Sequence, residues 1–137
     1  MITMKELCKY DLTKLPKEHV DNLNTLLEKL NIIRAEFGRP MIVTSGYRSL
    51  EDHLRIYKQK GITDKTKIPM GSKHLVGAAC DILDKDNSLQ RFITKNIDNI
   101  ADLDLWLEDF SASKTWAHIQ ILPYKSWKPG GSRWFTP

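Results

Sequence analysis

Residues 71–82, GSKHLVGAACDI, place His74 seven residues before Asp81 around a run of small residues. Two side chains that bind one metal ion must bring their ligand atoms within roughly 4 Å of each other. A continuous strand would point the two side chains to opposite faces, and a continuous helix would separate them by about 10 Å along its axis. If they share a site, the chain must therefore bend between them, and Gly77 can take that bend without steric cost.

A histidine and an aspartate beside a glycine also occur together in ordinary turns and helix N-caps. The metal-site interpretation therefore depends on a further ligand from elsewhere in the chain. Residues 115–122, TWAHIQIL, are predicted to form a strand on which Trp116, His118 and Gln120 share one face. The other face is aliphatic, so His118 is expected to point away from the aliphatic side.

Residues 103–108, LDLWLE, are predicted to pair with that strand as a hairpin, through the polar turn DFSASK. A turn centred near Ser113 would place Glu108 opposite His118, with roughly 5 Å between their Cβ atoms. Two histidines and one carboxylate leave a fourth tetrahedral position open for water, which is the arrangement of catalytic zinc. A nearby glutamate is the usual general base for such a water.

Apolar periodicity and capping residues predict helices over residues 16–37, 50 to about 60, and 88–97. Gly38 ends the first helix, Ser49 with Asp52 caps the second, and Ser88 or Asn87 caps the third. A short apolar strand is predicted over residues 41–45, and the tail from residue 123 is predicted to be a loop. The fold class is therefore α+β, with helices packed on a small antiparallel sheet that carries the site.

The length of 137 residues suits a single domain, residues 1–137, and the proportions of hydrophobic (41%) and charged (28%) residues suit a globular one. No window approaches the roughly 20 apolar residues that span a bilayer, and the start lacks the apolar core of a signal peptide. We expect synthesis in the cytoplasm, no membrane insertion and a monomer. The two cysteines are expected to be free thiols, because they are too few for a disulfide framework.

The net charge of +4 favours polyanionic partners in general, without selecting one. Nucleic-acid binding is the weakest hypothesis, because the lysines are scattered and no predicted helix carries a continuous basic face. We therefore expect no nucleic-acid partner.

Three ordered motifs resemble those of the zinc D-Ala-D-Ala metallopeptidases, whose fold is shared with lysostaphin-type and hedgehog domains. The first is SGYRS, the last is WAH, and the central one is S-x-H-x-x-G-x-A-x-D, formed by Ser72, His74, Gly77, Ala79 and Asp81. The resemblance runs from about Ile42 to Gln120. It implies a peptidase that acts on the peptide stems of bacterial peptidoglycan.

The resemblance also implies roles for individual residues. One Zn²⁺ per chain would be held by His74, Asp81 and His118. Arg48 would bind a substrate carboxylate or polarise the scissile carbonyl, which suits its fixed fork of donors. Ser72 would support the substrate side of the cleft. Tyr47 either lines that cleft to contact substrate or packs as a core aromatic.

One position departs from the pattern. Many relatives carry the general base three residues before the last histidine, where this chain has Thr115, so we assign the base to Glu108. An alternative is a zinc-stabilised module that binds the cell wall without catalysis. The sequence does not identify which peptide bond is cleaved, or whether the enzyme is a carboxypeptidase or an endopeptidase. Three biological settings also stay as alternatives: a viral lysis enzyme released by a separate pore, a virion-associated enzyme, or an enzyme that acts on the cell wall of the bacterium that encodes it.

Other residues offer weaker candidates. Cys80 is expected to be a buried thiol rather than a ligand, and His53 to lie at the surface or pack a helix. His19 has no predicted partner. Trp127 and Trp134 either contact sugar or wall polymer, or pack the tail onto the domain.

Overall fold

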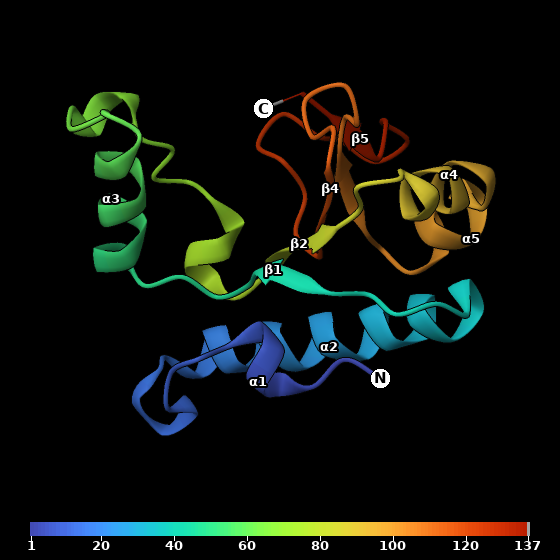
Figure 1. The fold of residues 1–137 in the computed structure, drawn as a ribbon, viewed down its shortest axis with the longest axis horizontal. Coiled ribbons are helices and arrows are strands. Elements are labelled where there is room, and N and C mark those ends of the chain that lie inside the picture. The colour runs from blue at the N-terminus through green and yellow to red at the C-terminus, as the bar shows by residue number, and fades with distance from the viewer. Residues whose placement is uncertain (137) are drawn as a thin grey trace.

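The computed structural model describes residues 1–136, and its strands form one mixed five-stranded sheet in the order β1-β2-β4-β3-β5 (Figure 1). The strands are Val43–Ser45 (β1), Ala79–Leu83 (β2), Trp106–Glu108 (β3), Trp116–Gln120 (β4) and Trp134–Phe135 (β5). All neighbours pair antiparallel except β3 and β5. The predicted α+β class and the predicted hairpin are confirmed.

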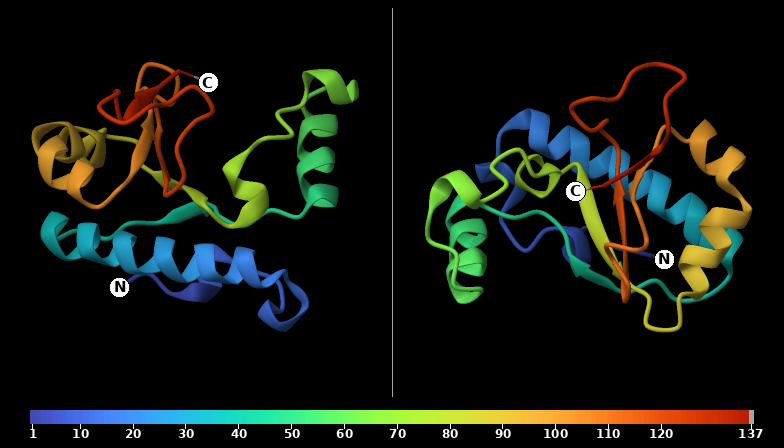
Figure 2. Two further views of the ribbon diagram at one scale, coloured as in Figure 1. Left: turned by 180° about the vertical axis from the view of Figure 1, so that it is seen from behind. Right: turned by 90° about the horizontal axis from the view of Figure 1, so that it is seen from above.

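The helices surround this sheet on three sides. They are Met4–Leu7 (α1), Lys17–Phe37 (α2), Leu50–Gln59 (α3), Ser88–Lys95 (α4) and Ile97–Asp102 (α5), with 3-10 turns at Leu12–Lys14 (η1), Lys65–Lys67 (η2) and Lys73–Val76 (η3). Figure 1 shows α2 running beneath the strands. Seen from above, α3 and the α4–α5 pair lie on opposite sides of the central strands (Figure 2).

The long helix α2 supplies the floor of the core, as its apolar periodicity predicts. Its buried residues belong to one hydrophobic cluster with the inward residues of β2 and β4; in α2 they are Leu23, Leu26, Leu30 and Ile33. Full burial of each such side chain contributes about 1.5–3 kcal/mol. Gly38 ends the helix in the left-handed region, and its N–H donates to the carbonyl of Arg34.

Helix α3 begins as predicted, since the Ser49 hydroxyl accepts a hydrogen bond from the Asp52 N–H (3.1 Å). The cap predicted for the third helix is confirmed in position, since Asn87 is the N-cap residue of α4, but the capping hydrogen bonds come from another residue. Neither Asn87 nor Ser88 caps α4 with its side chain; the carboxylate of Asp84 accepts from the N–H groups of Leu89 and Gln90 instead (both 2.9 Å). Asp84 precedes the helix by several residues, so the spacing of a standard cap did not reveal it.

The tail contains a strand where a loop was expected. Strand β5 pairs in parallel with β3 at the edge of the sheet, where the Leu107 N–H donates to the Arg133 carbonyl (2.7 Å). A strand of two residues is too short to show an alternating pattern in the sequence. It forms because the edge of β3 offers backbone hydrogen-bonding groups with which it can pair. The sheet is therefore antiparallel except at this edge.

The register of β2, β4 and β3 decides what the site contains. Asp81 pairs with His118 across β2 and β4, and Leu107 pairs with Ile119 across β3 and β4. Continuing the second register by one residue places Glu108 opposite His118, which is the arrangement that a turn near Ser113 predicts.

Candidate metal centre

The bend predicted between His74 and Asp81 is present. His74 lies in η3, the chain turns at Gly77 with a φ of 75°, and Asp81 then lies in β2. A Cβ atom at position 77 would stand 2.7 Å from the carbonyl oxygen of His19, so glycine is required by both conformation and space. This close approach lets the chain turn directly above α2.

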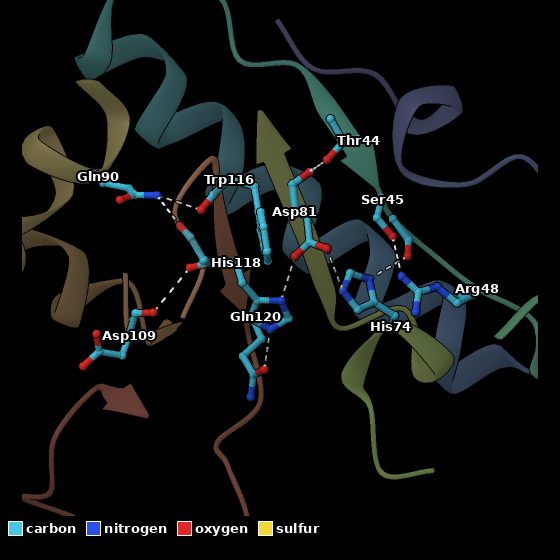
Figure 3. A network of polar contacts seen from close by, with 12 residues as sticks. Thr44, Ser45, Arg48, His74, Asp81, Gln90, Asp109, Trp116, His118 and Gln120 are labelled. Atoms are coloured by element: carbon cyan, nitrogen blue, oxygen red, sulfur yellow. Dashed lines mark hydrogen bonds and ion pairs between the residues drawn. The ribbon is translucent and has the colours of Figure 1, made fainter. Parts of the chain in front are cut away.

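Three side chains converge where η3, β2 and β4 meet (Figure 3). Ligand atoms of His74, Asp81 and His118 all lie within 4.8 Å of one another. The Asp81 carboxylate is central, 2.8 Å from Nδ1 of His118 and 3.5 Å from Nε2 of His74. Both histidines are buried, with exposed fractions of 5% and 8%.

Hydrogen bonds on the far side of each ring orient the two histidines. Nδ1 of His74 lies 2.9 Å from the carbonyl of Gly46, which can only accept, so this nitrogen carries the proton. The Gln120 amide nitrogen donates to the carbonyl of Leu122 (2.7 Å), which turns its oxygen towards Nε2 of His118 (2.8 Å). In the metal-free protein Nδ1 of His118 and Nε2 of His74 face the Asp81 carboxylate, and each would offer a lone pair to a metal only after losing the proton shared with Asp81.

The electrostatics keep the central carboxylate anionic. Burial alone would raise the pKa of Asp81, but hydrogen bonds from His118 and His74 hold that pKa well below its usual range. Burial lowers the pKa of His118, yet the contacts with Asp81 outweigh it and the net shift is upward. Two imidazole nitrogens and one carboxylate oxygen are a donor set that fits Zn²⁺ and leaves a position open.

A cavity of about 630 Å³ opens over this cluster, between α3 with the following loop and the C-terminal segment. Glu108, Arg48 and Ser72 line it, and Glu108 is half-buried, so burial raises the pKa of its carboxyl. Ser72 immediately precedes η3, where its carbonyl accepts from the Leu75 N–H (3.1 Å). The structure thus brings these three predicted residues to the same cleft as the three candidate metal ligands.

Tyr47 is not among the residues that line this cavity. Its hydroxyl lies 3.0 Å from Nδ1 of His19, and its ring meets that of Tyr10 edge to face at 5.5 Å. Its backbone N–H donates to Leu7 (2.7 Å). Of the two alternatives for Tyr47, the structure favours packing, and the same contact gives His19 the partner that the sequence did not reveal.

Arg48 is held by contacts at both ends. Its Nη2 donates to the hydroxyl of Ser45 (2.7 Å), and its Nη1 lies 3.1 Å from Nδ1 of His53. Its backbone N–H donates to the carbonyl of His74 (3.0 Å). His53 was expected at the surface or against a helix; it is fully buried and lies beside the candidate substrate arginine.

The weaker candidates pack into the fold. Trp127 meets Trp106 edge to face at 5.1 Å, with the Arg133 guanidinium stacked over both rings. Trp134 meets Phe110 at 4.6 Å. Cys80 is fully buried on the opposite face of β2 from Asp81, and burial raises the pKa of its thiol. The packing alternative therefore accounts for the tail aromatics.

A model of the family described as Peptidase M15 matches residues 3–119. The match includes every residue from Tyr47 to His118 that the sequence motifs single out. No curated protein and no solved structure matches the chain. Within residues 1–136, no helix is long and apolar enough to cross a membrane.

Proposed function

The chain belongs to the peptidase M15 family, the zinc D-Ala-D-Ala metallopeptidases, and we propose that it hydrolyses the peptide stems of bacterial peptidoglycan. The observation that carries the proposal is the convergence of His74, Asp81 and His118 beneath a cleft that also holds Glu108. A binding module would need the cluster for stability but would have no use for a half-buried carboxylate opposite a ligand.

One Zn²⁺ per chain would be held by His74, Asp81 and His118. When bound, the ion would activate water and polarise the scissile carbonyl as a Lewis acid. The chain's own residues prepare the site, because Gly46 and Gln120 fix the orientation of both imidazoles before any metal arrives.

Glu108 is proposed to take the proton from the attacking water and return it to the leaving amine. Burial raises the pKa of its carboxyl towards the range in which a group can both accept and donate a proton near neutrality. Thr115, at the position where many relatives carry the base, is exposed and does not line the cleft. This leaves Glu108 as the carboxylate placed for the role.

The charge around the cleft favours an acidic peptide. Its walls carry one arginine and three lysines: Arg48, Lys60, Lys73 and Lys125. None of the three lysines pairs with a carboxylate within residues 1–136. Peptidoglycan stems carry several free carboxylates, and Arg48 can grip one of them with two parallel hydrogen bonds.

The second candidate is a wall-binding module that retains the metal without turnover, which the departure at Thr115 favours. Soluble stem peptides of defined composition separate the two. Mass spectrometry of the products should reveal a new fragment, and its mass would name the bond and distinguish carboxypeptidase from endopeptidase action. Binding to the same stems without any new fragment would support the module instead.

The setting proposed is breakdown or remodelling of the cell wall. The same chemistry suits three settings: a virus-encoded lysis enzyme released by a separate pore, a virion-associated enzyme, and a bacterium's own cell-wall enzyme. A monomer acting alone on its substrate suits the cleft, since all of the proposed site residues come from one chain.

A further inference from the structure

His53 lies fully buried in the first turn of α3, directly behind the wall of the cleft. It is absent from the residues that line the cavity, so it cannot touch a substrate there. Its two ring nitrogens nevertheless contact two parts of the cleft wall: Nδ1 lies 3.1 Å from Nη1 of Arg48, and Nε2 lies 3.0 Å from the carbonyl of Pro69.

The two contacts fix the protonation of the ring. The Pro69 carbonyl can only accept, so Nε2 of His53 carries the proton and donates it. A guanidinium can only donate, so Nδ1 must present its lone pair to Arg48. An imidazolium could not make both bonds. Burial, with the positive charge of Arg48 adding to it, lowers the pKa of His53 and keeps the ring neutral.

These bonds fix the position of the Arg48 guanidinium relative to the three candidate metal ligands. Ser45 accepts from Nη2 and His53 from Nη1, so the guanidinium is gripped at two nitrogens. The backbone of Arg48 is tied to His74, one of the candidate ligands. A guanidinium held in this way loses little further freedom when it grips a carboxylate.

We propose that His53 is a positioning residue, which holds the Arg48 guanidinium and the segment before Ser72 in the geometry that binds substrate. The proposal rests on the proposed function, because Arg48 is its substrate-binding partner. Pro69 precedes Ser72 by three residues, so one imidazole joins the two sides of the wall between α3 and η3.

Two substitutions of His53 test its two hydrogen bonds one at a time, the bond with Arg48 and the bond with Pro69. In His53→Asn the amide oxygen stands near the place of Nδ1 and can still accept from Arg48. In His53→Gln the longer side chain reaches the place of Nε2 and can still bond Pro69, but the acceptor for Arg48 is lost. We expect His53→Asn to keep most of kcat/KM, and His53→Gln to lose about 10- to 100-fold, chiefly through KM, because the arginine is misplaced.

A double-mutant cycle with Arg48 distinguishes a positioning role from a merely structural one, because only a positioning residue would show non-additive losses of kcat/KM. His53→Gln introduced into Arg48→Ala should cause no further loss of kcat/KM, whereas a residue that only supports folding would add its full loss in that background. Equal losses from Asn and Gln, or additive losses with Arg48→Ala, would overturn the proposal. Arg55→Gln, on the exposed face of the same helix, is the matched control and should leave kcat/KM unchanged.

A measurement without substrate keeps this inference separate from the proposed function. In the metal-free wild-type protein, ¹⁵N spectra of His53 should show a neutral ring protonated at Nε2 at pH 7. Side-chain N–H signals of Arg48 should be resolved, and His53→Gln should average them while His53→Asn should not. A His53 ring protonated at Nδ1, or averaged Arg48 signals in the wild type, would contradict the positioning role even if peptidase activity is found.

Discussion

The two faces of the β2–β4 pair have the same backbone and opposite chemistry. One face presents Cys80, Ile82, Ala117 and Ile119 to the core, all with no exposed surface, and the other presents Asp81, His118 and Gln120 to the cleft. Most of the cleft-face side chains are also well buried, so burial does not separate the two faces. What differs is that Asp81, His118 and Gln120 are joined in one chain of hydrogen bonds, which orients the His118 ring beside the candidate metal position.

The comparison predicts that substitutions within the five residues of one strand can change stability and function separately. Substitutions on the core face should change the free energy of unfolding and leave the chemistry of the folded protein intact. Substitutions on the cleft face should do the reverse. The following variants test this division, beginning with the largest effect.

Glu108→Gln should lower kcat by about 10²- to 10⁴-fold, because the amide cannot accept the proton of the attacking water. Zinc content and thermal stability should stay near those of the wild type, since Glu108 is not one of the three clustered ligands. Hydrolysis of a stem peptide and elemental analysis of the same sample check both statements. Full activity in this variant would reassign the base.

Ile119→Ala should lower the free energy of unfolding by about 2–5 kcal/mol, because it leaves a cavity in the fully buried core face. Urea denaturation measures the loss. The remaining folded protein should bind zinc with unchanged affinity, although position 119 is next to His118. A matched loss of zinc affinity would show that the two faces are not independent.

Gln120→Leu should weaken zinc binding by about 10- to 100-fold, since it removes the acceptor that orients His118. Competition with a chelating dye measures the affinity. The neighbouring Ile121, which is also buried but lies on the core side, provides the control as Ile121→Val, which should leave zinc affinity unchanged. Unaltered affinity in the Gln120 variant would mean that Asp81 alone orients the ring.

Lys60→Ala and Lys125→Ala should each raise KM for an acidic stem by a few-fold, with the effect fading as salt screens the charge. Lys85, which follows the end of β2 and lines a separate cavity, is the control as Lys85→Ala. Stems whose carboxylates are amidated should show a smaller difference between wild type and variants. An equal effect on both kinds of stem would remove the charge argument for substrate choice.

Much of the site could be predicted because its constraints are local. The bend at Gly77 follows from the need to bring His74 and Asp81 together, and the hairpin register follows from the spacing about Ser113. The alternation along β4 also separates His118 and Gln120 from Ile119. Each of these follows from periodicity or turn chemistry within about a dozen residues.

What could not be predicted depends on contacts between distant segments. Strand β5 forms only because the edge of β3 accepts it, and Asp84 caps α4 from beyond the usual spacing. His53 resembles an ordinary helix residue until Arg48 and Pro69 approach it from two loops. No local sequence pattern predicts these tertiary contacts.

The most direct test of the central claim is the digestion of purified peptidoglycan by the protein as isolated, after chelation, and after zinc is restored. We predict that soluble peptide fragments appear, disappear on chelation and return with zinc, while the His118→Ala variant releases none under any condition. Fragment release that is unaffected by chelation would contradict the account, as would intact stems in the presence of demonstrably bound zinc.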